Sequence, residues 1–356
     1  MKLVMKIMAA ILASLLAWEL LLNVFVEHSS GSYSHPVLGR ISKAGINIFG
    51  TEGYSLTRYN SLGMRSTEIK PRIGNEVRVL MLGDSYTEGA QVESNQTFSY
   101  LTQKQLRTIN SNVQVINGGR RGASPAYYIH LSSFYKQKID PKYVVIQINA
   151  EDFTNDLLDT QKYFYVKKQD DHYETVFNDT FVSTNPITQK FNKLDFLTQV
   201  SIMRVGVEKL QLLMGSGGTS NEGEGGVPGG MQVAAAAEKD TPQPKDETNY
   251  EPIINWTFSE LKKDYPNLVL LLLPGIDYHH LTEKEPNVEA LIRSEAKKQD
   301  IALIDMRDDF LSYFKSNHTP LTGFNNTMPG EGHLNKYGHM LIADRLGQTL
   351  EREMKP

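Results

Sequence analysis

The sequence predicts a three-layer α/β/α domain on a mostly parallel sheet, preceded by a single transmembrane helix. Two patterns predict it: short apolar runs alternate with amphipathic stretches, and a longer apolar segment stands at the N-terminus. Of the 356 residues, 40% are hydrophobic and 22% are charged, which is ordinary for a folded globular protein. The formal net charge of −4 excludes a strongly basic nucleic-acid binder, so we expect no nucleic-acid partner.

The sequence contains no cysteine. This excludes a disulfide framework, a thiolate metal site, a cysteine nucleophile and an N-terminal lipid anchor on cysteine. The adjacent pair His279-His280 has no acid cluster placed with it, and adjacent residues rarely converge on one ion. We therefore expect no metal and no other cofactor.

Short apolar runs predict the strands of the sheet. They cover residues 77–82, 113–117, 143–149, 267–273 and 301–306. Amphipathic stretches predict helices at about 97–108, 125–138 and 335–353. Strands that are apolar throughout are typical of a parallel sheet that helices cover on both faces.

The apolar segment at residues 7–26 predicts a membrane anchor. Its 20 residues form a helix about 30 Å long, which matches the hydrocarbon core of a bilayer. Lys2 and Lys6 precede it and no lysine follows directly, so residues 1–6 are predicted to be cytoplasmic. The rest of the chain is then exported, as a single-pass protein of the cytoplasmic membrane with its domain on the periplasmic or extracellular side.

Two alternatives to the anchor stay open. A cleaved signal peptide has an apolar core of only about 7–15 residues and a small-residue cleavage site, and no clean site follows Trp18. The segment is also compatible with an amphipathic helix packed on the domain. Its length favours the anchor.

Composition divides the remainder of the chain. Residues 27–76 form a polar lead-in, and residues 77–354 form the predicted α/β domain. An insertion at 160–250 interrupts this domain, with a predicted helix near 197–213. Its part at 215–247 is rich in Gly, Pro and acidic residues with almost no large apolar ones, so we expect it to be disordered.

The first candidate for chemistry is the turn Gly83-Asp84-Ser85, directly after the run at 77–82. Ligand sites of open α/β sheets lie at the carboxyl ends of strands, where a serine can present its hydroxyl to a crevice. A Ser or Asp at this place is also a common helix N-cap. The turn alone leaves both interpretations open.

The second candidate lies near the C-terminus. A nucleophilic serine needs a base within hydrogen-bond reach and a group that orients the base. His333 precedes the last predicted helix, which can return it to the same sheet edge, and Glu331 is placed to hold its ring. The alternative is a histidine that only begins a helix and a surface acid. Together with Ser85, the catalytic interpretation is favoured.

These residues resemble the motifs of the SGNH, or GDSL, hydrolase superfamily. The resemblance covers about residues 55–350 apart from the insertion. It implies a flavodoxin-like fold, with Ser85 as nucleophile and His333 as base, oriented by Glu331. It also maps the second block, the loop from Asn117 to Gly122, to an oxyanion hole formed by the backbone amides of Ser85 and Gly122.

The chain departs from the family in the third block. The family places Asn-Asp after the third strand, and that Asn donates a hydrogen bond to the oxyanion; here Glu151 stands in its place. A carboxylate accepts hydrogen bonds and repels a developing negative charge. Asn155 is the favoured replacement donor, Asn149 is a weaker one, and a hole with backbone donors alone is the third alternative.

Three residues beside the presumed site are candidates for substrate contact. They are Asp84, Arg120 and Arg121; the two arginines are either solvated surface or contacts to an anionic substrate. The predicted function is a serine esterase outside the cytoplasmic membrane, acting on an acyl ester of a small molecule or of an O-acetylated envelope or exopolysaccharide glycan. The alternatives are an O-acyltransferase with the same residues, or a non-catalytic envelope protein that binds glycan or an assembly partner.

Overall fold

A computed structural model describes residues 2–25, 32–50, 52–169, 172–178 and 249–355 of the chain. Its centre is a five-stranded sheet in which every neighbouring pair is parallel. The strands are β5 (Val77–Leu82), β6 (Val113–Asn117), β7 (Tyr143–Ile148), β10 (Leu268–Leu272) and β13 (Ala302–Asp305). Their order is β13-β10-β7-β5-β6, the flavodoxin-like order of doubly wound sheets. The predicted fold class is confirmed, and each predicted strand is present.

The strands are apolar throughout because both faces of the sheet are buried. Successive side chains of a strand point to opposite faces. In β5, Leu80 and Leu82 belong to one hydrophobic core, and Val79 and Met81 belong to the other. A parallel sheet with two covered faces needs this continuous apolar pattern.

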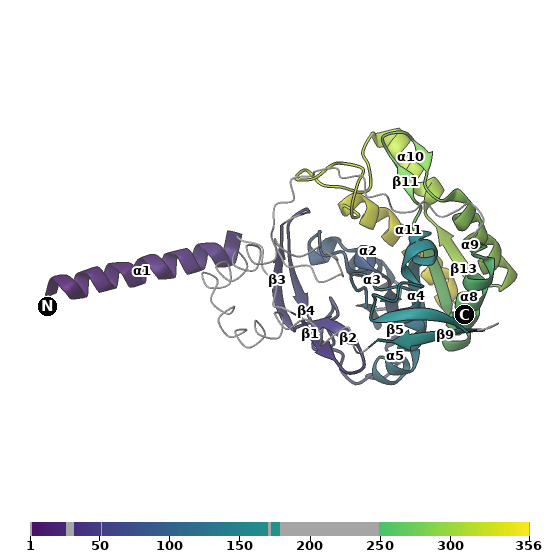
Figure 1. Ribbon diagram of the computed structural model, residues 1–356, viewed down its shortest axis with the longest axis horizontal. Coiled ribbons are helices and arrows are strands. Elements are labelled where there is room, and N and C mark those ends of the chain that lie inside the picture. The colour runs from purple at the N-terminus through teal and green to yellow at the C-terminus, as the bar shows by residue number, and fades with distance from the viewer. Residues whose placement is uncertain (1, 26–31, 51, 170–171, 179–248, 356) are drawn as a thin grey trace.

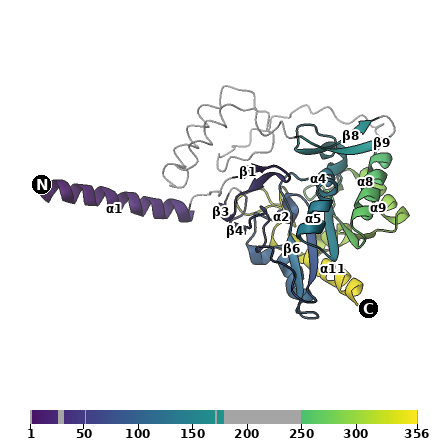
Figure 2. The ribbon, with the colours of Figure 1, turned by 90° about the horizontal axis from the view of Figure 1, so that it is seen from below.

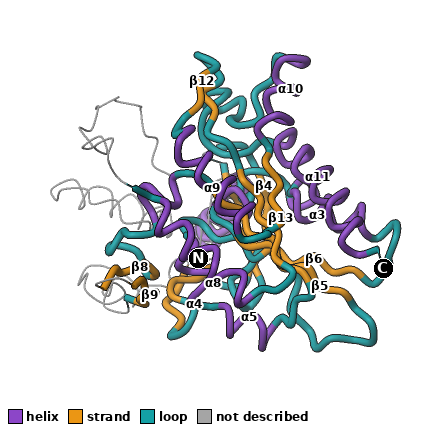
Figure 3. Tube along the Cα trace, turned by 90° about the vertical axis from the view of Figure 1, so that its right-hand side faces the viewer, coloured by secondary structure: helices purple, strands orange, loops and turns teal. Residues whose placement is uncertain are grey.

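Helices cover the two faces as two separate layers. One layer contains α4 (Pro125–His130), α5 (Ser132–Lys138), α8 (Glu251–Asp264) and α9 (Pro286–Lys298). The other contains α3 (Phe98–Leu106), α10 (Arg307–Asn317) and α11 (Lys336–Met354), and Figure 3 shows α3 and α11 side by side. The predicted helix at 125–138 is two helices, because Leu131 between them leaves the helical backbone conformation, at φ −94° and ψ 7°.

The N-terminal helix α1 (Lys2–Phe25) is long and apolar enough to cross a membrane over Lys2–Leu22. None of that span is buried inside the structure, which argues against a helix packed on the domain (Figure 1). A membrane span and a signal sequence both satisfy this description, so the predicted orientation and the uncleaved anchor stay predictions.

The lead-in folds as part of the domain. It contains two antiparallel hairpins, β1 (Ser32–His35) with β2 (Gly39–Ser42) and β3 (Gly45–Phe49) with β4 (Ser55–Tyr59). Three of its side chains, Leu38, Ile41 and Met64, are buried in the larger core. Arg65 is buried as well, and its guanidinium donates hydrogen bonds to the carbonyls of Glu88, Gly89 and Val92. These contacts fasten the lead-in to the segment that follows Ser85.

The described part of the insertion begins with a hairpin of β8 (Phe164–Gln169) and β9 (His172–Phe177). This hairpin packs on α4, as Figure 2 shows, and Phe164 is buried against Tyr127. The predicted helix near 197–213 and the predicted disordered segment at 215–247 both lie outside the described residues.

Candidate active site

Ser85 is the first residue of the short helix α2 (Ser85–Glu88), directly beyond the carboxyl end of β5. β5 lies between β6 and β7, where the strand order reverses, which is the usual ligand position in an open α/β sheet. Asp84 is the N-cap of α2, and its carboxylate accepts the N–H of Tyr86 at 2.7 Å. The helix-cap interpretation of this turn therefore holds for Asp84. The Ser85 hydroxyl takes no part in the cap.

His333 meets this serine from the other end of the chain. Its Nε2 lies 2.9 Å from the Ser85 Oγ, across 248 residues of sequence. The Tyr86 ring packs against the imidazole with centroids 5.5 Å apart, and its hydroxyl donates to the Gly332 carbonyl at 3.3 Å. The structure thus brings together the serine and the histidine that the sequence analysis paired as candidate nucleophile and base.

The carboxylate that holds His333 is Glu52, in the turn between β3 and β4. One Glu52 oxygen accepts the backbone N–H of His333 at 2.6 Å, and the other lies 2.5 Å from its Nδ1. Burial raises the pKa of Glu52, but the hydrogen bonds and the charge of His333 outweigh this and leave that pKa below its usual value of 4.5. Glu52 is therefore a carboxylate at neutral pH.

The prediction that Glu331 orients His333 is wrong. The Glu331 side chain is 60% exposed, and its carboxylate lies 3.8 Å from Nε2 of His279 instead. Gly332 causes this, because its left-handed backbone at φ +71° turns the chain between Glu331 and His333. A Cβ at Gly332 would overlap the Glu52 carboxylate, which fills the space beside the histidine.

Glu52 carries little signal in the sequence. It is an acid between two glycines, Gly50 and Gly53, which indicates a turn and nothing more. No spacing rule connects it to His333, since the two lie 281 residues apart. Only the packing of the lead-in on the domain brings them together.

The second-block loop lies against the nucleophile turn. The Arg120 N–H donates to the Gly83 carbonyl at 2.9 Å, and a Cβ at Gly119 would overlap the backbone of α2. Gly122 has a left-handed backbone at φ +70° in the turn closed by Ala123. Within the described chain, the backbone N–H groups of Ser85 and Gly122 donate to no protein acceptor. The oxyanion hole that the resemblance implies from these two amides stays a prediction.

The structure does not join Asn155 to the nucleophile turn. Asn155 is exposed in the single π-helical turn Asp152–Asp156, and no hydrogen bond joins it to Ser85 or Asp84 among the described residues. Asn149 is the amide beside the turn: its Nδ2 donates to the Asp84 carboxylate at 3.1 Å, while its Oδ1 accepts the Asp152 N–H. Glu151 is exposed.

Asp84 is part of the framework below the serine. Its two oxygens accept the Tyr86 N–H, the Asn149 amide and, at 3.4 Å, the Gln147 amide. Burial raises the pKa of Asp84 to about 6, against the lowering effect of the hydrogen bonds from Tyr86 and Gln147. Because both oxygens are engaged by the protein, the predicted substrate contact through Asp84 is not supported.

Arg120 and Arg121 are also engaged by the protein. Arg120 donates to the Leu38 carbonyl at 2.7 Å and lies over the Tyr127 ring. Arg121 lies 3.5 Å from the Glu88 carboxylate and over the Phe49 ring. Both arginines connect the loop after β6 to neighbouring segments, and this removes the basis for predicting an anionic substrate.

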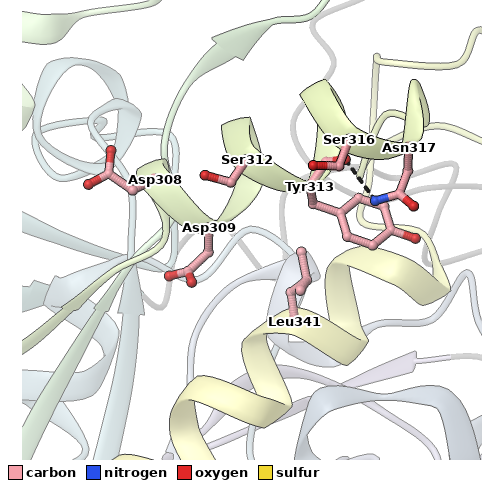
Figure 4. Close-up of a pocket in the computed structure, with 7 residues that line it drawn as sticks. All are labelled: Asp308, Asp309, Ser312, Tyr313, Ser316, Asn317 and Leu341. Carbon is pink, nitrogen blue, oxygen red and sulfur yellow. Dashed lines mark hydrogen bonds between the residues drawn. The ribbon is translucent and has the colours of Figure 1, made fainter.

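Outside the Ser85 site, the described residues form no metal site, but they do line a shallow pocket. The His/Asp/Glu residues of the described ranges form no group of three that could hold a metal ion. A shallow pocket lies on α10 and is lined mainly by its polar side chains, with Leu341 of α11 (Figure 4). None of its lining residues belongs to the Ser85 site.

Comparisons with known proteins return esterases, at low similarity. No family model and no curated protein matches the sequence. One similar solved structure is a two-domain esterase active on acetylated mannans, with 10% identity and a TM-score of 0.40; the match covers 78% of this chain and 49% of that one. This chain therefore spans about half the length of that esterase.

Two others match over nearly their whole length. The psychrotrophic esterase EstA from Pseudoalteromonas sp. has 11% identity and a TM-score of 0.39, with 78% of this chain and 99% of that chain covered. A lipase/acylhydrolase from Enterococcus faecalis has 10% identity and a TM-score of 0.40, with 79% and 98% covered.

Proposed function

We propose that this protein is a serine hydrolase of carboxylic esters, in which Ser85 is the nucleophile, His333 the base and Glu52 the acid that orients the base. The observation that carries the proposal is the continuous chain of contacts from Ser85 Oγ to His333 Nε2 and from His333 Nδ1 to Glu52. Enzymes that use a serine nucleophile for acyl transfer have this arrangement: the base lies within hydrogen-bond reach of the nucleophile, and a third group orients the base.

The first half of the reaction forms an acyl-enzyme. Ser85 Oγ attacks the ester carbonyl carbon as His333 Nε2 takes the hydroxyl proton. The carbonyl oxygen becomes an oxyanion, which the N–H groups of Ser85 and Gly122 receive. The C–O bond to the alcohol breaks, His333 returns the proton to the leaving oxygen, and the acyl group stays on Ser85.

The second half releases the acid. Water replaces the alcohol, and His333 takes a proton from it as its oxygen attacks the acyl carbon. The intermediate then collapses, Ser85 recovers its proton, and the carboxylic acid departs. Each proton removed is returned within one turnover, so the reaction requires no cofactor.

Glu52 supports both halves through the imidazole. Its carboxylate accepts the Nδ1–H, which leaves the lone pair of Nε2 toward Ser85, and it stabilises the imidazolium that forms in each step. The lowered pKa of Glu52 supports this role, because the group is ionised at the pH where the base works.

The apolar N-terminal helix supports an extracytoplasmic substrate. The apolar helix α1 is of the length that anchors or exports a domain. We propose an O-acyl ester of an envelope or exopolysaccharide glycan as the substrate, in a domain held at the outer side of the cytoplasmic membrane.

Active-site labelling tests the proposal. The purified full chain is exposed to a fluorophosphonate probe and, separately, assayed on p-nitrophenyl acetate, with Ser85→Ala as the matched control. We expect the wild type to be labelled and to hydrolyse the ester, and the variant to do neither. A folded wild type that is neither labelled nor active would overturn the proposal of an enzyme. That result would favour the alternative, a non-catalytic protein that binds glycan or an assembly partner. Transfer of the acyl group to an added glycan without release of acetate would identify an acyltransferase.

A further inference from the structure

The turn that carries Glu52 is held from outside by a side chain of another loop. Asn326 Nδ2 donates to the Gly50 carbonyl at 2.8 Å and to the Gly53 carbonyl at 3.2 Å. In return, the Gly53 N–H donates to Asn326 Oδ1 at 2.9 Å. The side-chain amide of Asn326 thus forms hydrogen bonds to the turn on both sides of Glu52, through its Nδ2 as donor and its Oδ1 as acceptor.

The loop that contains Asn326 also contains the base. It runs from Thr322 to Leu334, and these two residues close it through an antiparallel bridge. The Gly323 N–H donates to the His333 carbonyl at 2.9 Å, so His333 lies at the closed end of the loop. Base and amide are therefore parts of one small unit, and the amide reaches across to the turn of the acid.

Packing around Gly53 restricts the conformation of the turn. Gly53 has a left-handed backbone at φ +70°, and a Cβ there would overlap the Gln91 carbonyl and lie 2.8 Å from the Phe324 ring. Phe324 belongs to the same loop as Asn326. The turn is therefore packed against the loop at Gly53 and bonded to it at Gly50 and Gly53, which leaves Glu52 facing His333.

We propose that Asn326 is a positioning residue that sets the place of the Glu52 carboxylate relative to His333; this rests on the proposed function. Asn326 is exposed and touches neither Ser85 nor His333 through any hydrogen bond of the described chain, so it acts through Glu52. Catalytic groups displaced by about 1 Å lose up to about 100-fold in rate, so loss of this amide is costly.

The test is a double-mutant cycle on ester hydrolysis with the full chain. Asn326→Ala is measured in the wild type and in Glu52→Ala, which has no carboxylate left to position. Asn325→Ala is the matched control, because Asn325 is the exposed neighbour and forms no hydrogen bond with the described residues. Thermal unfolding of every variant reports whether it is folded, and the rate of fluorophosphonate labelling serves as a second readout for slow variants.

We expect Asn326→Ala to lower kcat/KM by about tenfold in the wild type and by less than about twofold in Glu52→Ala. Asn325→Ala stays within about twofold of the wild type. An equal loss from Asn326→Ala in both backgrounds would show a structural role and overturn the proposal, as would no loss in the wild type. Failure of the proposed function can be told apart from failure of this proposal, because Ser85→Ala would then have the same kcat/KM as the wild type.

Discussion

Glu52 and His333 lie 281 residues apart in the sequence, yet a Glu52 oxygen lies 2.5 Å from the histidine Nδ1 and the other accepts its backbone N–H. The acid of the candidate triad therefore comes from the segment between the apolar helix and the sheet. The predicted domain at 77–354 lacks this acid. The candidate site therefore includes the turn between β3 and β4, which lies in the lead-in.

The exposed carboxylate of Glu151 is expected to slow the reaction. By the resemblance, it stands where the family has an asparagine donor, and its side chain is exposed at the end of the segment after β7. We predict that Glu151→Asn raises kcat/KM on p-nitrophenyl acetate by at least about threefold, with about 1,000-fold as the upper limit set by a full oxyanion donor. Glu151→Ala separates loss of charge from gain of a donor. A slower Glu151→Asn enzyme would show that Glu151 has a positive role.

Gly119 is expected to be intolerant of a side chain. An added Cβ overlaps the backbone of Thr87 and Glu88 in α2, whereas at Gly118 it meets mainly leucine side chains, at 3.0 Å and beyond. We predict that Gly119→Ala lowers the free energy of unfolding by about 1–3 kcal/mol and reduces activity by displacing the Ser85 turn. Gly118→Ala is the matched control and loses less. Urea unfolding of both variants measures the difference, and equal losses would contradict the assigned packing.

His339 is expected to make stability fall in weak acid. It is fully buried, its Nδ1 accepts the Phe98 N–H at 3.2 Å, and burial, followed by the charges of Arg65 and His333, lowers its pKa from 6.5 to about 3. Between these two values the unfolded chain binds a proton that the folded chain does not, so the free energy of unfolding decreases as pH falls below about 6.5.

The slope from one such proton is at most about 1.4 kcal/mol per pH unit. Asp84 opposes it, because its raised pKa of about 6 makes the folded chain bind a proton more readily than the unfolded one. We therefore compare the wild type with His339→Asn by urea unfolding between pH 7 and pH 4.5. The variant is predicted to show a flatter loss of stability on the acid side; parallel curves would contradict a neutral buried His339.

Local signals in the sequence predict much of the fold and two of the three residues of the candidate triad, Ser85 and His333. The strands are predictable because burial on both faces demands continuous apolar runs, as in Val77–Leu82. Ser85 follows from a glycine turn at the end of such a strand, and His333 from the start of the last helix. These features are encoded by neighbours in the chain.

Contacts between distant segments were not predictable in this way. Glu331 is the nearer acid in sequence, but Gly332 turns it away and leaves the space to Glu52. The sequence favours Asn155 over Asn149 as a donor, yet the strand end places Asn149 beside Asp84 and the π-helical turn leaves Asn155 exposed. When two similar side chains are candidates for one position, the spacing along the chain does not tell which of them the packing of distant segments places there.

The central claim is that Glu52, and not Glu331, is the acid of a Ser85–His333 pair. The most direct measurement is kcat/KM for ester hydrolysis by Glu52→Gln and Glu331→Gln, each folded as shown by its thermal unfolding, beside Ser85→Ala as the inactive reference. The account predicts that Glu52→Gln loses at least about 100-fold and that Glu331→Gln stays within about threefold of the wild type. A large loss in Glu331→Gln with an unimpaired Glu52→Gln would contradict it.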